Sequence, residues 1–220
     1  MSAIEELEKT WHDQALSSII NMIKAPDGDF DSLGKLANAV GDEQSLQKLV
    51  EFLRTTPQGQ QAFEQRPRLD NVDLETLYRL PTNTLGYAYA NHLLKNNLKP
   101  LAAGKVEDDY QFLGAHLTET HDIWHIVTDC KTDIFGEIQL EAFYVAQLQF
   151  SRFWLGLLAK NLVKATIYNI EVSTKYMDAI TRGWLMGKQA QPLFGVEWSL
   201  LLAKPLEDIR TSFNIILSEA

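Results

Sequence analysis

The sequence predicts an all-α protein, and three observations support this fold class. Apolar residues recur at helical spacing through most of the 220 residues, strand signals are nearly absent, and the chain has no internal repeat or Gly-rich phosphate loop. With 45% hydrophobic residues, a chain of this length can bury one sizeable core. We therefore expect residues 1–220 to form a single helical domain.

The expected helices follow from apolar spacing, capping residues and helix breakers. The first spans 3–24, where one face carries Ile4, Leu7, Trp11, Ala15, Ile19 and Met22. It ends at Ala25-Pro26-Asp27-Gly28. Further helices are expected at about 30–40, 43–55, 57–64, just after 74, 84–96, 108–130, 133–160, 170–189 and 196–203. Residues 163–170, the only β-branched run, fit either a loop or a helix.

Charge and composition exclude several classes of function. The net charge of −9 and the pI of about 5.0 argue against nucleic acid as a partner and against purely electrostatic attachment to anionic lipid. A single cysteine, Cys130, excludes an intramolecular disulfide and fits a reducing compartment. The N-terminus resembles neither a signal nor a transit peptide, so no targeting peptide is expected. The most apolar stretch, 143–158, contains Gln and Arg and is expected to be a buried helix instead of a membrane span.

Metal-ligating residues gather at positions 121–137. His121 and His125 are four residues apart, which places them on one helix face, ~6 Å apart along the axis and ~40° apart around it. This spacing suits two imidazoles that bind one ion. Asp122 lies ~100° from His121 and can reach the same ion or orient one of its ligands.

A turn after the histidines brings in a carboxylate. The segment 129–133 is poor in helix formers, and a second helix is expected to start with Thr132 or Asp133 as its N-cap. Glu137 then lies about one turn from the loop, opposite His125, in an αα-hairpin. Glu141, one turn further on the same face, is an equal candidate by spacing alone.

Two histidines and one or two carboxylates form a nitrogen and oxygen site suited to zinc, with iron, manganese or magnesium as alternatives. The alternative without metal is a hydrogen-bonded histidine pair. Peptide hydrolysis is disfavoured because Asp122 replaces the glutamate of HExxH. A phosphohydrolase would need further ligands, and the His12-Asp13 pair fits a solvated helix face better. Cys130 fits a bystander better than a soft ligand.

Four blocks of this sequence resemble the coenzyme Q (ubiquinone) biosynthesis protein four family. HDIWH…GE at 121–137 resembles that family's HDxxH-x11-E signature, and RPRL at 66–69 and LPTNTLGYAYANHL at 80–93 resemble two further elements. The segment 179–215, with Trp198 and Pro-Leu-x-x-Ile-Arg, is similar to the closing block. The agreement covers about residues 60–215 in the family's order, whereas residues 1–60 match less clearly.

The resemblance implies a helical protein that binds a divalent metal, usually zinc, through His121, Asp122, His125 and Glu137, and so it favours Glu137 over Glu141. It also implies work on polyprenylated benzoquinone precursors, together with other quinone-biosynthesis proteins. Such a protein would act as a catalyst that replaces the ring C1 carboxyl by hydroxyl in an oxidative decarboxylation. The alternative is a non-catalytic, lipid-binding organiser of the biosynthetic enzyme complex. We expect catalysis, with the four motif residues as the catalytic site.

A prenyl substrate would need an apolar groove, which several residues of 143–158 could line beside the metal. They are Phe143, Tyr144, Phe150, Phe153, Trp154, Leu157 and Leu158. Core packing is the competing explanation for these residues. An apolar opening would give peripheral membrane contact, and we expect a cytoplasmic protein that touches the inner face of a bacterial membrane. The apolar C-terminal helices also favour a homodimer.

Overall fold

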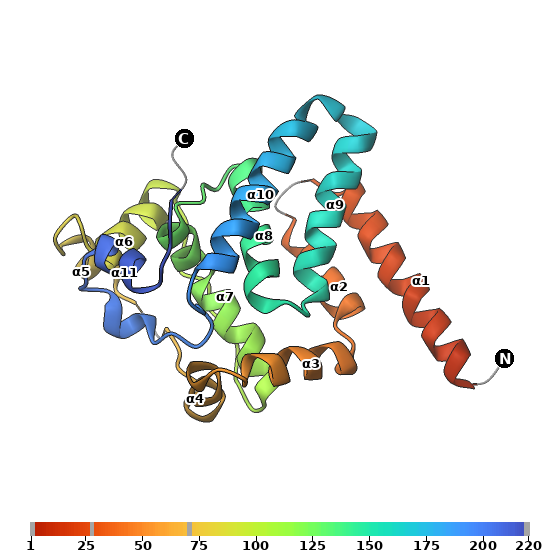
Figure 1. Ribbon diagram of the computed structural model, residues 1–220, viewed down its shortest axis with the longest axis horizontal. Helices are drawn as coiled ribbons and strands as arrows, with labels where there is room; N and C mark the ends of the chain where they lie inside the picture. The colour runs from red at the N-terminus through yellow and green to blue at the C-terminus, as the bar shows by residue number, and fades with distance from the viewer. Residues whose placement is uncertain (1–2, 27–28, 70–71, 218–220) are drawn as a thin grey trace.

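The computed structural model describes residues 3–26, 29–69 and 72–217, and it confirms the all-α prediction (Figure 1). Within these ranges no segment forms a strand, and the one β-type contact is an isolated bridge between Thr84 and Pro205. The α-helices are α1 (Ala3–Lys24), α2 (Phe30–Val40), α3 (Glu43–Leu53), α4 (Pro57–Gln65), α5 (Leu74–Tyr78), α6 (Leu85–Lys95), α7 (Asp109–Thr128), α8 (Ile134–Leu148), α9 (Arg152–Tyr168), α10 (Ser173–Gln189) and α11 (Leu206–Ser212). Two 3-10 turns, η1 (Ile170–Val172) and η2 (Trp198–Leu201), complete the set.

The predicted continuous helix at 133–160 is wrong, because α8 ends at Leu148 and α9 begins at Arg152. Gln149 takes a left-handed φ of 39°, and the Ser151 side chain then caps α9 by accepting the Trp154 N–H at 3.5 Å. The reversal lets the Trp154 ring stack on the Tyr144 ring, with centroids 3.8 Å apart and planes 3° from parallel. Aromatic packing across the turn thus accompanies a break that no Gly or Pro marks in the sequence.

This turn also corrects the expectation of one buried helix over 143–158. Phe150, at the turn, is 48% exposed. By contrast, Phe143, Tyr144, Leu157 and Leu158 are buried, so core packing accounts for these four of the residues predicted to line a groove. The ambiguous segment 163–170 is helical as far as Tyr168, and α11 is a helix that the sequence pattern did not predict.

The main core contains residues from every helix between α3 and α8, from α10 and from the C-terminal segment. They pack around large buried side chains such as Trp124, Tyr144 and Trp198. A smaller apolar cluster attaches α1 and α2 to α9, and in Figure 1 α1 lies along the outside of the molecule. No helix among the described residues is both long and apolar enough to cross a bilayer.

Two glycines let α10 pack closely on α8, the helix that carries Glu137. A Cβ on Gly183 would lie 1.9 Å from the Gln139 carbonyl oxygen, and one on Gly187 would lie 2.7 Å from the Ala146 Cβ. Both clashes are far below van der Waals contact. The spacing between α8 and α10 therefore depends on the absence of these side chains.

Candidate metal site

The two helices that carry the site form the predicted αα-hairpin. The Asp108 side chain caps α7 by accepting the Gln111 N–H at 2.8 Å, and α7 ends at Thr128, followed by Asp129 with a left-handed φ of 54°. Asp133 is the N-cap of α8 and accepts the Gly136 N–H at 2.9 Å. A Cβ on Gly136 would lie 2.0 Å from the Lys131 carbonyl oxygen, so a tight turn requires glycine beside Glu137.

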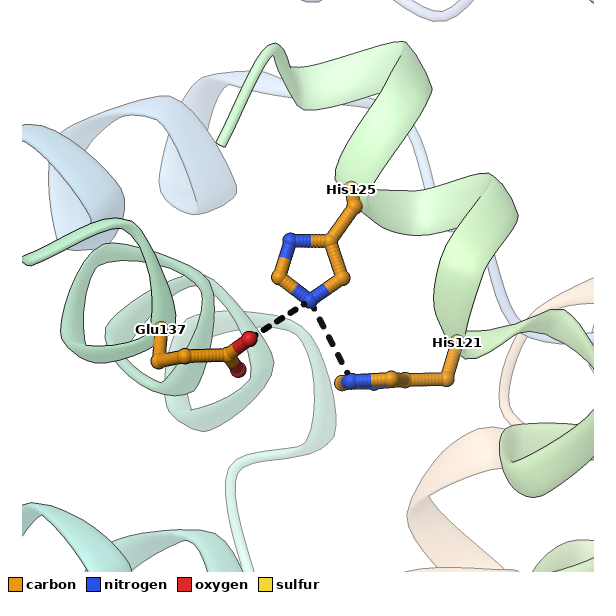
Figure 2. Close-up of side chains that lie close together, drawn as sticks. All are labelled: His121, His125 and Glu137. Atoms are coloured by element: carbon orange, nitrogen blue, oxygen red, sulfur yellow. Dashed lines mark hydrogen bonds and ion pairs between the residues drawn. The ribbon is translucent and has the colours of Figure 1, made fainter. Parts of the chain in front are cut away.

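The hairpin brings three of the four predicted ligands together (Figure 2). His121 and His125 project from α7 toward Glu137 on α8, and one ligand atom from each lies within 4.8 Å of the others. The Nε2 atom of His125 is 3.2 Å from Nε2 of His121 and 3.3 Å from Oε1 of Glu137. His125 is 2% exposed, whereas Glu137 is 35% exposed, so the cluster is reached from the Glu137 side.

Hydrogen bonds around the cluster orient the two histidine rings. Nδ1 of His125 donates to the Cys130 carbonyl oxygen at 2.9 Å, so Nε2 is the nitrogen that faces the other two residues, and in the neutral ring its lone pair can bind an ion. Nδ1 of His121 lies 3.3 Å from the Tyr144 hydroxyl. Two nitrogens bound tetrahedrally to zinc at ~2.05 Å would be roughly 3.3 Å apart. The donor set and its spacing therefore fit a divalent ion.

The charges within the cluster are unequal. Burial lowers the pKa of His125, but the hydrogen bond and charge of Glu137 outweigh burial and raise the pKa above its ordinary value. Burial raises the pKa of Glu137, but the hydrogen bond and charge of His125 bring it below the ordinary value. Burial lowers the pKa of His121 to about 4, so this ring is neutral at pH 7.

The remaining predicted candidates fall outside this three-residue cluster. Asp122 is buried beside it, and burial raises the pKa of its carboxyl. Glu141 is buried and accepts a 2.8 Å hydrogen bond from Asn161, so the structure brings Glu137, and not Glu141, to the histidines. The Cys130 carbonyl orients His125, while burial raises the pKa of its thiol to about 12.

His12 and Asp13 are exposed on α1, as expected of a solvated face. Motif spacing missed His92, which lies 29 residues before His121 on α6. The His92 ring lies 6.4 Å from the His125 ring, with planes 18° from parallel. Its Nε2 atom is buried without a hydrogen-bond partner in the part of the chain that the structure describes. No spacing rule connects α6 to α7, so only the tertiary structure identifies this neighbour.

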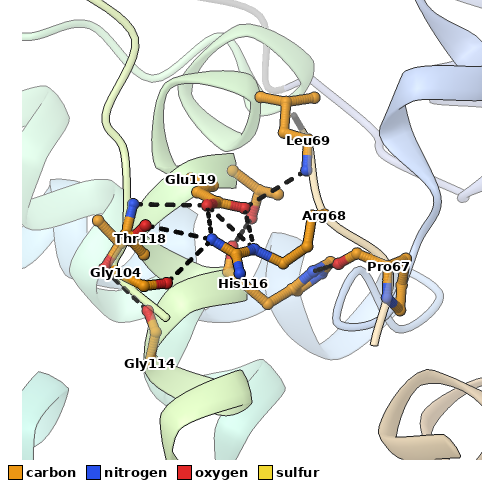
Figure 3. Close-up of polar contacts among 10 residues, drawn as sticks. Pro67, Arg68, Leu69, Gly104, Gly114, His116, Thr118 and Glu119 are labelled. Carbon is orange, nitrogen blue, oxygen red and sulfur yellow. Dashed lines mark hydrogen bonds and ion pairs between the residues drawn. The ribbon is translucent and has the colours of Figure 1, made fainter. Parts of the chain in front are cut away.

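The RPRL block holds the first half of α7 (Figure 3). Arg68 pairs with Glu119 through two guanidinium nitrogens, Nε at 2.8 Å from Oε2 and Nη2 in closer contact with Oε1. Arg66 lies 3.2 Å from Asp109 at the helix start. His116 bridges two distant loops, because its Nδ1 contacts the Pro67 carbonyl at 3.2 Å and its Nε2 accepts the Gly195 N–H at 3.0 Å. These contacts fix α7 ahead of the histidine ligands.

The closing block holds the other end of α7. Arg210 donates from Nε to the Val127 carbonyl at 3.0 Å and from Nη2 to the Ile126 carbonyl at 2.8 Å. These two carbonyls belong to the last turn, where a helix leaves its acceptors unpaired and favours a positive charge. The family-like blocks at 66–69 and 205–210 thus contact the helix that carries His121 and His125.

Comparisons with known proteins identify the family of this chain. The sequence profile of the family described as "Coenzyme Q (ubiquinone) biosynthesis protein Coq4" matches residues 4–219. A mitochondrial COQ4 homolog from Anopheles gambiae is 26% identical over 202 residues, which cover 85% of this chain and 67% of the relative. The mitochondrial COQ4 of Scheffersomyces stipitis is 26% identical over 181 residues, which cover 77% of this chain and 54% of the relative. The chain thus spans about half to two thirds of the length of these relatives.

A solved structure shares the fold. The crystal structure of a protein from Nostoc punctiforme PCC 73102, assigned to ubiquinone biosynthesis, superimposes with a TM-score of 0.84 at 28% identity. The match covers 93% of this chain and 98% of the other. The chain belongs to the coenzyme Q (ubiquinone) biosynthesis protein Coq4 family.

Proposed function

We propose that the chain binds one divalent metal ion and acts on a polyprenylated hydroxybenzoate in ubiquinone-type quinone biosynthesis, where the ring C1 carboxyl is replaced by hydroxyl. The observation that carries the proposal is the convergence of His121, His125 and Glu137 on one point between α7 and α8. Asp122, in the adjacent buried position, is the proposed fourth motif residue. Zinc suits this donor set, and iron, manganese or magnesium are the alternatives.

The chemistry sets what this chain must supply. Loss of the carboxyl as CO2 with gain of a hydroxyl removes two electrons from the ring, so an electron acceptor such as O2 is a co-reactant. A divalent metal, when bound, supplies a Lewis acid for the negative charge that develops on the carboxylate and the neighbouring ring oxygen. Zinc does not activate oxygen, so the hydroxylation half requires a redox metal or a partner enzyme. The role of the chain's own residues is then to bind and orient the ring.

Apolar residues at the α8–α9 turn offer a path for the prenyl tail. The Trp154 ring lies 6.2 Å from the His121 ring, and Phe153 and Trp154 are only partly buried. Phe150, 48% exposed, continues this apolar surface outward. We place the start of the tail along these three residues, since each buried methylene contributes ~0.8 kcal/mol.

The α9–η1–α10 segment is the proposed surface for membrane contact. It exposes large apolar side chains that include Leu155, Ile167, Tyr168, Ile170 and Met177. Residues 152–189 carry six Lys or Arg and two Asp or Glu, within a chain of net −9; Lys160 is buried and Arg152 pairs with Asp42, so the remaining side chains give this segment a net +2. Exposed apolar groups with local positive charge favour an anionic lipid surface. Sedimentation with anionic vesicles tests this contact, and a homodimer that buries the same surface is the competing outcome.

The metal and the reaction are tested together. Purified protein should hold about one metal ion per chain by elemental mass spectrometry, and His125→Ala should lose it while His12→Ala, an exposed histidine, keeps it. Product analysis with a prenylated 4-hydroxybenzoate, O2 and each candidate metal should detect CO2 release from wild type and His12→Ala but not from His125→Ala. Metal whose removal unfolds the protein, together with partner binding and no turnover, would favour the organiser role instead.

A further inference from the structure

We propose that His92 and Tyr89 on α6 form the polar wall that binds the acidic head group of the aromatic substrate next to the metal. This inference rests on the proposed function and assigns a binding role to residues outside the HDxxH-x11-E motif. His92 Nε2 and Tyr89 Oη act as hydrogen-bond donors to carboxylate or hydroxyl oxygens of the ring.

The first support is the position of His92. Its ring lies nearly parallel to that of His125 at a centroid distance of 6.4 Å, which is too far for a direct bond and close enough to border the same site. His92 is not one of the three residues whose ligand atoms converge. It therefore lies beside the proposed ion and does not bind it in this arrangement.

The second support is a pair of buried polar atoms without partners. Nε2 of His92 and Oη of Tyr89 are both inaccessible to solvent and make no hydrogen bond within the described ranges. The residues are three apart on α6 and so share one face of the helix. Buried polar groups are nearly always hydrogen-bonded, and a polar ligand would supply the partner that these two atoms on one helix face lack.

Electrostatic contacts place both residues on the side of α7 that carries Asp122. Burial has the largest effect on the pKa of both residues. The Asp122 charge adds to the rise in the pKa of Tyr89, and it opposes the fall in the pKa of His92. A tyrosine hydroxyl is a neutral hydrogen-bond donor, and a neutral histidine ring that carries its proton on Nε2 is another. Neutral donors suit an anionic oxygen in a buried site.

The test separates metal affinity from head-group affinity. Full-length protein, stripped of metal and reloaded with Co2+, is titrated with 4-hydroxybenzoate as the soluble probe, and binding is followed by calorimetry. The visible absorption of bound Co2+ reports changes at the ion itself. His92→Leu and Tyr89→Phe remove the donors, His92→Gln restores one N–H, and His12→Leu is the matched control on the exposed face of α1. Circular dichroism checks that each variant folds. If His92→Leu does not fold, Tyr89→Phe and His92→Gln are compared with wild type instead.

We expect His92→Leu to weaken 4-hydroxybenzoate about tenfold or more while the Kd for Co2+ changes less than about threefold. His92→Gln should recover part of the lost affinity, and Tyr89→Phe should show a smaller loss. Unchanged probe affinity in His92→Leu and Tyr89→Phe would overturn the inference. So would a tenfold loss of Co2+ affinity with altered absorption, because His92 would then be a metal ligand. Wild-type protein that binds Co2+ without the probe overturns this inference alone, whereas protein that binds neither overturns the proposed metal function as well.

Discussion

Replacing Gly183 by alanine tests whether the close packing of α10 on α8 is as tight as the structure indicates. The added methyl carbon would lie 1.9 Å from the Gln139 carbonyl oxygen, while a carbon needs roughly 3.3 Å from such an oxygen. The helices would have to separate by roughly 1.4 Å, the difference between the two distances. A backbone atom cannot rotate away from the methyl group as a side chain can.

Two effects of opposite sign decide how much Gly183→Ala changes the free energy of unfolding. Overpacking costs about 3 kcal/mol when backbone must move, and alanine in a helix returns about 1 kcal/mol relative to glycine. We therefore expect Gly183→Ala to lower the free energy of unfolding by about 2 kcal/mol. For a chain of this size the Tm should fall by about 4–8 °C.

Gly114 on α7 provides the matched control. It is also a helical glycine, but a Cβ there would meet nothing within 4 Å. Gly114→Ala should therefore raise the free energy of unfolding by about 0.5–1 kcal/mol. Urea denaturation of the two variants and wild type gives both values. If Gly183→Ala is as stable as wild type, or gains stability like the control, the packing of α8 on α10 is not as described.

Three further predictions concern α7 and its supports. Burial lowers the pKa of His116 from 6.5 to about 4, so unfolding takes up a proton between these values. The free energy of unfolding should then fall by up to about 3 kcal/mol as pH drops through this window, and urea titrations of His116→Gln should lack that component. Arg210→Met removes two hydrogen bonds to the last turn of α7 and should cost about 2 kcal/mol, against less than about 0.5 for the exposed Arg79→Met; equal losses would contradict the capping role. Tyr144→Phe removes the hydroxyl beside the first motif histidine and should weaken Zn2+ binding about tenfold in chelator competition, whereas the exposed Tyr110→Phe should not.

The sequence identifies the helices with long amphipathic patterns and clear caps, and it fails where tertiary contacts decide. The α7–α8 turn could be predicted because Asp133 is a strong N-cap and the preceding residues are poor helix formers. The α8–α9 break could not, since Gln149 and Phe150 are acceptable in a helix and the reversal accompanies the stacking of two aromatic rings. The seven-residue α11 is too short to show a period.

The sequence likewise predicts one part of the candidate site, and tertiary contacts decide the rest. The pairing of His121 with His125 follows from helix geometry, and the approach of Glu137 follows from the length of the turn. Spacing does not separate Glu137 from Glu141. The structure does so by burying Glu141 against Asn161. His92 has no spacing relation to the motif at all, because only the folded chain brings α6 beside α7.

The contacts of Arg68 and Arg210 with α7 have a consequence for assembly of the site during folding. The two arginines are 142 residues apart in the chain, yet both must reach α7 before its ends are fixed. The contact of Arg68 with Glu119 spans 51 residues and that of Arg210 with Val127 spans 83, and contacts between residues this far apart slow folding because long loops must close before the contacts form. An isolated hairpin of α7 and α8 would hold the same three side chains on an unsupported scaffold. The geometry for binding an ion is thus a property of the completed chain, and ligand pre-organisation is gained in the same step as global stability.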